Sequence, residues 1–230
     1  MRTVLITGAN RGIGLELTRE RLAQGDQLIA CARKPDEAAA LEGLAAAHRA
    51  SMSVVPLNVA DATSVFALCN AVGERPIDVL VANAGIIGPE RQSTLDMDYE
   101  GWAETFAVNT MGPLRVAQAL LPNLRRSSNA LVMIVSSQMG SMASSSSDRL
   151  AYRASKAAAN KVAQALAHDF KPMGIAVVSV HPGWVRTEMG GAQAPLSPSE
   201  SARGLSRLID GTGLAQTGRF LNVDGAELRW

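Results

Sequence analysis

The chain has 230 residues, 47% of them hydrophobic, and its 22 basic and 21 acidic side chains leave a formal net charge of +1. This length supports one well-buried core, so we expect a single domain over residues 1–230. No basic run or acidic tail occurs, which argues against a partner such as nucleic acid or an anionic membrane. The two cysteines are too few for a disulfide scaffold, and the apolar opening 4–6 is too short for a signal peptide or membrane span. We therefore expect a cytoplasmic protein.

Short apolar, β-branched runs alternate with longer segments rich in alanine and leucine, a pattern typical of a parallel sheet covered by helices. We predict strands, in chain order, at Thr3–Thr7, Gln27–Ala32, Ser53–Leu57, Val79–Ala82, Ala130–Ser136, Ile175–His181 and Arg219–Asn222. Helices are predicted at Ile13–Gln24, Asp36–Arg49, Asp61–Val72, Trp102–Arg125 with a break at Gly112-Pro113, and Ala151–Lys171. The serine-rich stretch Ser141–Ser147 and the stretch Gly190–Pro198 are predicted to be loops. Together these elements predict a doubly wound α/β fold that binds ligands at the carboxyl ends of its strands.

A glycine-rich turn directly follows the first predicted strand and leads into the first predicted helix. Its sequence, Thr7-Gly8-Ala9-Asn10-Arg11-Gly12-Ile13-Gly14, has the spacing G-x-x-x-G-x-G rather than the G-x-G-x-x-G of the standard dinucleotide fingerprint. Glycines in such a turn let backbone N–H groups and a helix N-terminus approach a diphosphate. The turn therefore predicts a dinucleotide site, and the alternative is a glycine turn that only reverses the chain.

The end of the second predicted strand carries a signal for the choice between NAD and NADP. A carboxylate at this point would hold the ribose diol of NAD, whereas an arginine accommodates a 2′-phosphate. The chain has Ala32-Arg33-Lys34 here and no acid before Asp36, and Arg11 in the glycine turn offers a second positive charge. The sequence favours NADP(H), unless these are ordinary solvated basic residues.

Tyr152 and Lys156 lie four residues apart on one face of a predicted helix. A neighbouring ammonium group lowers the pKa of a phenol, so we expect Lys156 to lower the pKa of Tyr152 toward neutrality. Ser137 lies upstream and could hydrogen-bond the same substrate atom as the phenol. The alternatives are an exposed Tyr–Lys pair and a serine that only ends a strand or starts a turn.

Together these residues resemble the short-chain dehydrogenase/reductase family. The resemblance rests on the glycine turn, Asn83-Ala84-Gly85, Asn109, Ser137, Tyr152-x-x-x-Lys156 and Pro182-Gly183-x-x-x-Thr187, in that order. Within the family, the chain is most similar to the C-factor/sniffer-like branch, through His181–Gly191 and through Phe220–Gly225 followed by Trp230.

The resemblance implies a Rossmann domain with a seven-stranded parallel sheet in the order 3-2-1-4-5-6-7. It also implies an NAD(P)-dependent oxidoreductase of the carbonyl reductase or alcohol dehydrogenase type, acting on a small carbonyl or hydroxyl substrate. Tyr152 would be its general acid and base, Ser137 would orient the substrate oxygen, and Lys156 would hold the nicotinamide ribose. Asn109 would hold a water that relays protons to the lysine, although a turn or helix break is an alternative role.

The cofactor site expected from the motifs and the resemblance is broad. The family usually has an aspartate where this chain has Asn58, which can still hydrogen-bond adenine but carries no charge. The three histidines lack ligand spacing, so no metal site is expected. The expected cofactor-binding residues are Gly8, Asn10, Arg11, Gly12, Ile13, Gly14, Arg33, Asn58, Val59, Asn83, Ala84, Gly85, Tyr152, Lys156, Pro182, Val185 and Thr187.

Substrate identity does not follow from the sequence. Gln138, Trp184 and Met189 are candidates for the substrate pocket, and core filling is an equal alternative for the last two. A different class of function is a nucleotide-responsive regulatory protein in which turnover is incidental, because the C-factor branch includes proteins with developmental roles. A serine hydrolase using Ser137 is a weak third candidate, since the serine is not in a G-x-S-x-G elbow.

The family pairs its subunits through two helices, so we expect a homodimer or homotetramer. In this chain the corresponding surface would be the alanine-rich face of the helix 151–171, together with Leu114, Ala117 and Leu121 of the neighbouring helix.

Overall fold

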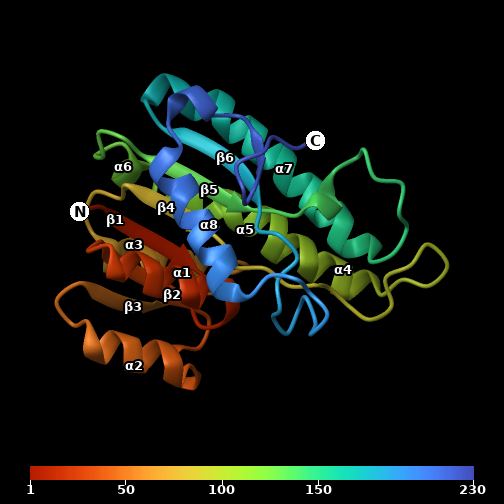
Figure 1. Cartoon of the computed structure of the whole chain (residues 1–230), viewed down its shortest axis with the longest axis horizontal. Helices are drawn as coiled ribbons and strands as arrows, with labels where there is room; N and C mark the ends of the chain where they lie inside the picture. Colours follow the sequence, from red (N-terminus) through yellow and green to blue (C-terminus); the bar gives the residue numbers. More distant parts are fainter.

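The computed structural model describes all 230 residues and contains a seven-stranded parallel sheet with helices on both faces (Figure 1). The strand order β3-β2-β1-β4-β5-β6-β7 confirms the predicted fold. Strands β2 and β3 are added on one side of β1, and β4 to β7 on its other side. The switch point between β1 and β4 is where open α/β sheets bind ligands. The strands are β1 (Thr3–Thr7), β2 (Gln27–Ala32), β3 (Met52–Pro56), β4 (Val79–Ala82), β5 (Leu131–Val135), β6 (Ala176–His181) and β7 (Phe220–Asn222).

The two faces of the sheet carry separate hydrophobic cores because side chains alternate along each strand. In β1, Leu5 belongs to the core on one face, and Val4 and Ile6 belong to the core on the other. Both faces are covered, which explains why the central strands are almost entirely apolar. The first face packs against α3 (Ala62–Val72), α5 (Gly112–Ala119) and α7 (Leu150–Phe170), and the second against α1 (Gly12–Ala23), α2 (Ala39–Ala47) and α8 (Pro198–Gly211).

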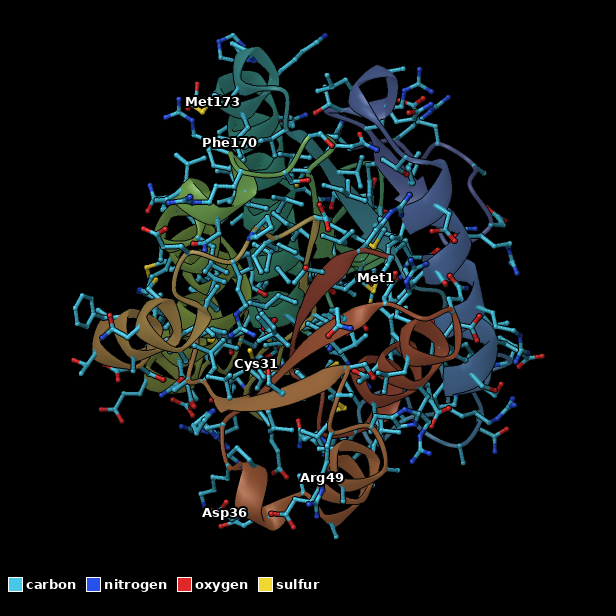
Figure 2. The ribbon with its side chains drawn as sticks, turned by 90° about the vertical axis from the view of Figure 1, so that its left-hand side faces the viewer. Met1, Cys31, Asp36, Arg49, Phe170 and Met173 are labelled. Atoms are coloured by element: carbon cyan, nitrogen blue, oxygen red, sulfur yellow. The ribbon has the colours of Figure 1, made fainter.

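Figure 2 shows this layering from the amino end of the strands, with Phe170 at the end of α7 near one margin and Asp36 beside α2 at the opposite margin. At the other end of the strands, the carboxyl edge, the loops around residues 86–98, 141–149 and 183–197 gather beside α4 (Tyr99–Phe106) (Figure 1). None of the helices has the length and apolar character needed to cross a membrane.

The segment predicted as one helix with a break at Gly112-Pro113 is built differently. Helix α4 begins at Tyr99, three residues earlier, because the Asp98 carboxylate caps the N–H of Gly101. A π-helical segment, η2 (Ala107–Met111), then leads into α5 without a break at Gly112-Pro113. Pro113 is tolerated because it lies at the start of α5. The helix is interrupted instead at Leu120, before α6 (Leu121–Leu124).

Helix α8 was absent from the sequence prediction, although its start carries a readable signal. Ser197 and Glu200 form a capping box, in which each side chain bonds the other residue's backbone N–H, and Pro198 occupies the first helical position. The helix packs against α1. There the buried guanidinium of Arg21 bonds Asp26 on its own side and Ser206 and Asp210 of α8.

Candidate active site

The glycine turn connects β1 to α1 at the switch point of the sheet. Gly8 and Gly12 adopt φ values of +67° and +54°, which residues with a side chain rarely adopt. A Cβ atom on Gly14 would lie 2.2 Å from the carbonyl oxygen of Gly8, so only glycine allows this close approach. The turn therefore has the shape in which backbone N–H groups can face a diphosphate, as predicted for Gly8, Gly12 and Gly14. Asn10, Arg11 and Ile13 lie in the same turn or at the start of α1.

The segment Asn83-Ala84-Gly85, which follows β4, holds the glycine turn in place. The amide nitrogen Nδ2 of Asn83 donates to the carbonyl oxygens of Thr7 and Gly8, at 3.0 and 3.1 Å. The hydroxyl of Thr7 accepts from the backbone N–H groups of Asn83 and Ala84. These bonds join the carboxyl ends of β1 and β4, so the segment Asn83-Ala84-Gly85 borders the predicted cofactor site.

Three cations near the ends of β1 and β2 differ in their availability for a phosphate. Lys34 is paired with Glu37 at 2.7 Å, and Arg11 is paired with Glu188. Arg33, just beyond β2, is exposed and its side chain makes no ion pair or hydrogen bond. Arg33 is thus the cation free to meet a 2′-phosphate, whereas Arg11 would first have to leave a carboxylate.

Asn58 and Val59 follow β3 at the same edge. The Asn58 side-chain oxygen accepts from the N–H of Ala60, and its Nδ2 makes no hydrogen bond within the protein. Nδ2 therefore remains available as a donor for an adenine ring. Val59 is buried, its side chain lies against Gly112, and its carbonyl accepts from Arg115.

The loop after β6 reaches back to the glycine turn. A Cβ on Gly12 would lie 3.2 Å from Cγ2 of Thr187, so the two segments face each other across the predicted cofactor site. Thr187 Oγ1 accepts from the N–H of Gly190, and the carbonyl of buried Val185 accepts from the N–H of Thr187. Pro182 is anchored through its carbonyl, which accepts from the hydroxyl of Ser201 in α8. The predicted cofactor residues of this loop thus lie opposite those of the turn.

Tyr152, Lys156 and Ser137 come together in the structure. Tyr152 and Lys156 lie one turn apart on α7, both buried, with the lysine Nζ 5.7 Å from the centroid of the tyrosine ring. Ser137 follows β5 and lies near enough to Tyr152 to lower the pKa of the phenol. The Ser137 hydroxyl oxygen accepts from the N–H of Met139 at 3.1 Å, so it also starts the short helix η3 (Gln138–Gly140). The alternative of an exposed Tyr–Lys pair is therefore wrong.

The electrostatics of this group differ from the sequence-based expectation. Burial raises the pKa of Tyr152, and the Ser137 hydrogen bond and the charge of Arg149 only partly oppose that rise. Lys156 is not among the groups that lower the pKa of Tyr152, so the prediction that it does so is wrong for this structure. Its Nζ donates instead to the carbonyl of Val135 at 2.9 Å, and burial lowers the pKa of Lys156 itself to about 8.

Asn109 lies inside the π-helical segment η2 and is buried. Its side-chain oxygen accepts from the N–H of Ile86 at 2.9 Å, and its Nδ2 donates to Ile86 O and Ser155 Oγ. A Cβ on Gly85 would lie 3.2 Å from Asn109 Oδ1 and 3.5 Å from Lys156 Nζ, so these two groups border the same small space. Asn109 thus stabilises the π-helical segment η2 through these hydrogen bonds and lies near Lys156.

The three predicted substrate residues do not share one cavity. Gln138 is exposed and lines a cavity of about 310 Å³ between η3, the serine-rich loop and the C-terminal segment. Trp184 and Met189 lie on the loop after β6 and do not line that cavity. Trp184 is 55% exposed, with its Nε1 donating to the carbonyl of Gly190, so it does not fill the core.

Several residues of the site escaped the sequence analysis. The Gln92 side-chain oxygen accepts from the backbone N–H of Tyr152 at 3.1 Å, and the Ser155 hydroxyl bonds both Asn109 and the carbonyl of Tyr152. Gln92 lies in no recognisable motif, and Ser155 occupies an unspecified position inside Tyr152-x-x-x-Lys156, so the motifs single out neither residue. The structure contains no group of three or more His, Cys, Asp or Glu side chains placed to hold a metal ion.

This combination of a doubly wound sheet, a glycine turn and a buried Ser–Tyr–Lys group defines a nucleotide-dependent oxidoreductase. The sequence model of the family described as short chain dehydrogenase matches residues 2–195. The protein belongs to this short-chain dehydrogenase/reductase family and is an NAD(P)-dependent oxidoreductase.

Individual relatives agree with the predicted family and branch. C-signal of Myxococcus xanthus is 44% identical over 156 residues, covering 67% of this chain and 93% of that protein. The NADPH-bound carbonyl reductase from chicken fatty liver is similar with a TM-score of 0.93 and 31% identity, covering 100% of this chain and 99% of that one. Carbonyl reductase Sniffer of D. melanogaster has a TM-score of 0.93 and 32% identity, with 100% of both chains covered.

Proposed function

We propose that this protein is an NADP(H)-dependent carbonyl reductase, or an alcohol dehydrogenase in the reverse direction, with Tyr152 as general acid and base. The observation that carries the proposal is the meeting of Tyr152, Ser137 and Lys156 at the carboxyl end of the sheet, next to the glycine turn. The similarity to solved carbonyl reductases, one of them bound to NADPH, supports the same reaction class and cofactor.

The choice of NADP(H) over NAD(H) follows from the charges at the end of β2. Arg33 is free of internal partners and no carboxylate lies between the end of β2 and Asp36, so a 2′-phosphate would meet a cation where NAD would find no acceptor for its diol. The glycine turn would hold the diphosphate, and Thr187 and Val185 the nicotinamide end. Asn58 would contact adenine, and Asn83 to Gly85 the adenosine ribose.

The bound cofactor supplies the hydride that reduces the carbonyl carbon. Tyr152 donates its proton to the carbonyl oxygen, and Ser137, beside the phenol, orients that oxygen by a hydrogen bond. The phenol is protonated at neutral pH with its ordinary pKa as well as with the raised one, so Tyr152 is in the form needed for reduction. Lys156 would hold the nicotinamide ribose, and Asn109 would position the proton relay that resupplies the tyrosine.

A direct test is to measure NADPH oxidation in the presence of each member of a panel of aldehydes, ketones and quinones. We expect turnover with at least one class of carbonyl compound and slower turnover with NADH at equal concentration. Binding of NADPH without oxidation in the presence of any panel member would contradict the reductase proposal.

The similarity to C-signal supports a second candidate, a regulatory protein in which cofactor occupancy matters and turnover is incidental. The two functions separate in a cell whose own gene is replaced by the Tyr152→Phe variant. Loss of the cellular phenotype together with turnover supports the reductase, and a surviving phenotype supports the regulatory role. Ser137 as a hydrolase nucleophile has no support, because its hydroxyl accepts from the N–H of Met139 and makes no hydrogen bond to a histidine.

The proposal also includes a cytoplasmic location, one domain over residues 1–230, and a homodimer or homotetramer. Ala117 cannot contribute to the subunit surface as expected, because it is fully buried in the core. The exposed apolar surface includes instead aromatic rings on α4, where Tyr99, 74% exposed, stacks on Trp102 and the ring of Phe106 is tilted against that of Trp102. Sedimentation as a strict monomer would contradict this assembly.

A further inference from the structure

Arg149 occupies an unusual backbone conformation at the mouth of the proposed active site. It is the only residue other than glycine with a positive φ, at 51°, and it directly precedes helix α7. The left-handed conformation costs an ordinary residue on the order of 1 kcal/mol, and such strain concentrates at functional sites. Arg149 lies three residues before Tyr152, at the point where the serine-rich loop meets helix α7.

Arg149 also differs from its neighbours in having no partner. Four other arginines at this edge of the sheet are each paired with a carboxylate, and the guanidinium of Arg149 makes no ion pair or hydrogen bond although it is exposed. An unpaired guanidinium presents five donors in a planar fork that matches a carboxylate or phosphate. The paired arginines are Arg11 with Glu188, Arg91 with Asp96, Arg153 with Asp148, and Arg186 with Glu200.

A cavity of about 480 Å³ is lined in part by Arg149. Ile87 is the single hydrophobic residue of its lining, which is formed almost entirely by the segment that follows Asn83-Ala84-Gly85. Gln92, in the wall, joins the cavity to the proposed catalytic group, because its side chain accepts from the N–H of Tyr152 and its carbonyl accepts from the N–H of Leu150. The lining residues are Ile87, Gly88, Pro89, Glu90, Arg91, Gln92, Ser93, Asp96 and Arg149.

We propose that this cavity receives the distal part of the carbonyl substrate and that Arg149 binds an anionic group there, a carboxylate or a phosphate. This inference rests on the proposed reductase function and narrows its substrate class to anionic carbonyl compounds. The charge of Arg149 reaches the phenol of Tyr152 and lowers its pKa, which agrees with a guanidinium close to the reacting end of the site. A substrate held by Arg149 would therefore have its carbonyl within a short reach of Tyr152.

The two carboxylates of the cavity equal its two arginines in number, but only one of them is ion-paired. Asp96 is neutralised by Arg91 at 3.3 Å, and Glu90 is exposed at the wall with no ion pair. Glu90 would repel an anionic substrate, so it weakens the preference that Arg149 creates. Removal of the Glu90 charge should strengthen the preference, which provides a variant with an effect of the opposite sign.

The test compares two aldehydes that differ by one charge, 4-carboxybenzaldehyde and its methyl ester. Wild-type protein should reduce the acid with a higher kcat/KM than the ester. Arg149→Asn removes the charge while asparagine tolerates the left-handed conformation, and it should lower kcat/KM for the acid by roughly 10-fold, mainly through KM, with the ester changed less than about 2-fold. Arg149→Lys should keep part of the preference, and Glu90→Gln should increase it.

Arg125→Gln serves as the matched control, since it removes one unpaired, exposed arginine at the opposite edge of the sheet and should leave both substrates unchanged. Equal loss for acid and ester in Arg149→Asn, or no preference for the acid in wild type, overturns the inference. If neither aldehyde is reduced, the wider panel of aldehydes, ketones and quinones still decides the proposed function, and quenching of bound NADPH fluorescence decides the inference. Weaker binding of 4-carboxybenzaldehyde to Arg149→Asn then supports it, and equal binding overturns it.

Discussion

Lys156 lies beside Tyr152 but gives its hydrogen bond to the carbonyl of Val135, 2.9 Å from its Nζ. Burial acts on both side chains, raising the pKa of the phenol and lowering the pKa of the ammonium to about 8. The two values therefore approach each other, since each group resists its charged form in the same apolar surroundings. Protonated tyrosine is the form that a reductase requires. A phenol of ordinary pKa, about 10, is already protonated at neutral pH, and burial favours that form further.

Replacement of Tyr152 by phenylalanine should remove the proton donor and leave the cofactor site intact. We expect kcat to fall by about 10²–10⁴-fold, the usual contribution of general acid catalysis, and the Kd for NADPH to change less than about 2-fold. NADPH oxidation and fluorescence titration measure the two quantities. The matched control is Tyr99→Phe, an exposed tyrosine on α4 that should leave kcat unchanged. Retention of more than about a tenth of wild-type kcat in Tyr152→Phe would remove Tyr152 from the mechanism.

Lys156 should make the stability of the protein depend on pH in an unusual direction. Its pKa is 10.5 when unfolded and about 8 when folded, so between these values the unfolded state binds more protons. Stability from this group therefore rises as pH increases through this window, because the cost of a buried charge is relieved. Lys156→Met lacks that cost, so its free energy of unfolding relative to wild type should fall by ~2 kcal/mol from about pH 7.5 to about pH 9.5.

Urea unfolding of wild type and Lys156→Met at the two pH values measures this difference. Lys161→Met provides the control, since Lys161 is an exposed residue of the same helix and should show no comparable pH dependence. A constant difference between wild type and Lys156→Met would show that the ammonium is not held at a lowered pKa.

Arg33→Ala should discriminate between the two nicotinamide cofactors. A charge-assisted bond to phosphate contributes about 1.5–3 kcal/mol, so we expect the Kd for NADPH to rise by roughly 10- to 100-fold and that for NADH by less than about 2-fold. Titration of bound-cofactor fluorescence measures both. Lys34→Ala is the control, because Lys34 is already paired with Glu37. Equal losses for both cofactors would mean that Arg33 does not contact the 2′-phosphate.

Glu188 should oppose NADPH binding, because it pairs with Arg11 and places a negative charge beside the cofactor site. Both side chains are exposed, so the effect is small and screened by salt. Glu188→Gln should lower the Kd for NADPH by roughly 2- to 5-fold at low ionic strength, with a smaller gain in about 1 M salt. Glu227→Gln, which alters a C-terminal pair with Arg219, should have no effect. Unchanged affinity in Glu188→Gln would assign Arg11 no part in phosphate binding.

Two glycine substitutions should have opposite effects on stability. Gly14→Ala would place a Cβ 2.2 Å from a backbone oxygen, so we expect a loss of roughly 1–3 kcal/mol and weaker cofactor binding. Gly43, inside helix α2, has open space at its Cβ, and Gly43→Ala should stabilise the protein by about 0.5–1 kcal/mol. Urea unfolding compares them, and a Gly14→Ala variant as stable as wild type would show that the turn relaxes freely.

The strands and most helices were predictable because each is specified by a local pattern. Residues 79–82 and 176–181 are largely apolar runs bounded by turn residues. Three of the seven strands agree with the prediction at both ends, and the other four differ by one residue at one or both ends. Helix α8 was missed because the prediction gave weight to the Gly/Pro-rich stretch before it and not to the capping box at Ser197. The π-helical segment around Asn109 could not be predicted, because its irregular backbone is stabilised by bonds to Ile86 and Ser155 from other parts of the chain.

The motifs by themselves indicated the family and the candidate group Ser137, Tyr152 and Lys156, since spacing along the chain is enough to recognise them. The order of the strands followed only through the resemblance to that family. Only the tertiary structure decided the charge states of that group and the position of Arg149 beside a polar cavity. Burial and electrostatic fields depend on the side chains that surround a group in space, and here those side chains come from segments up to 60 residues apart, as in the bond between Gln92 and Tyr152.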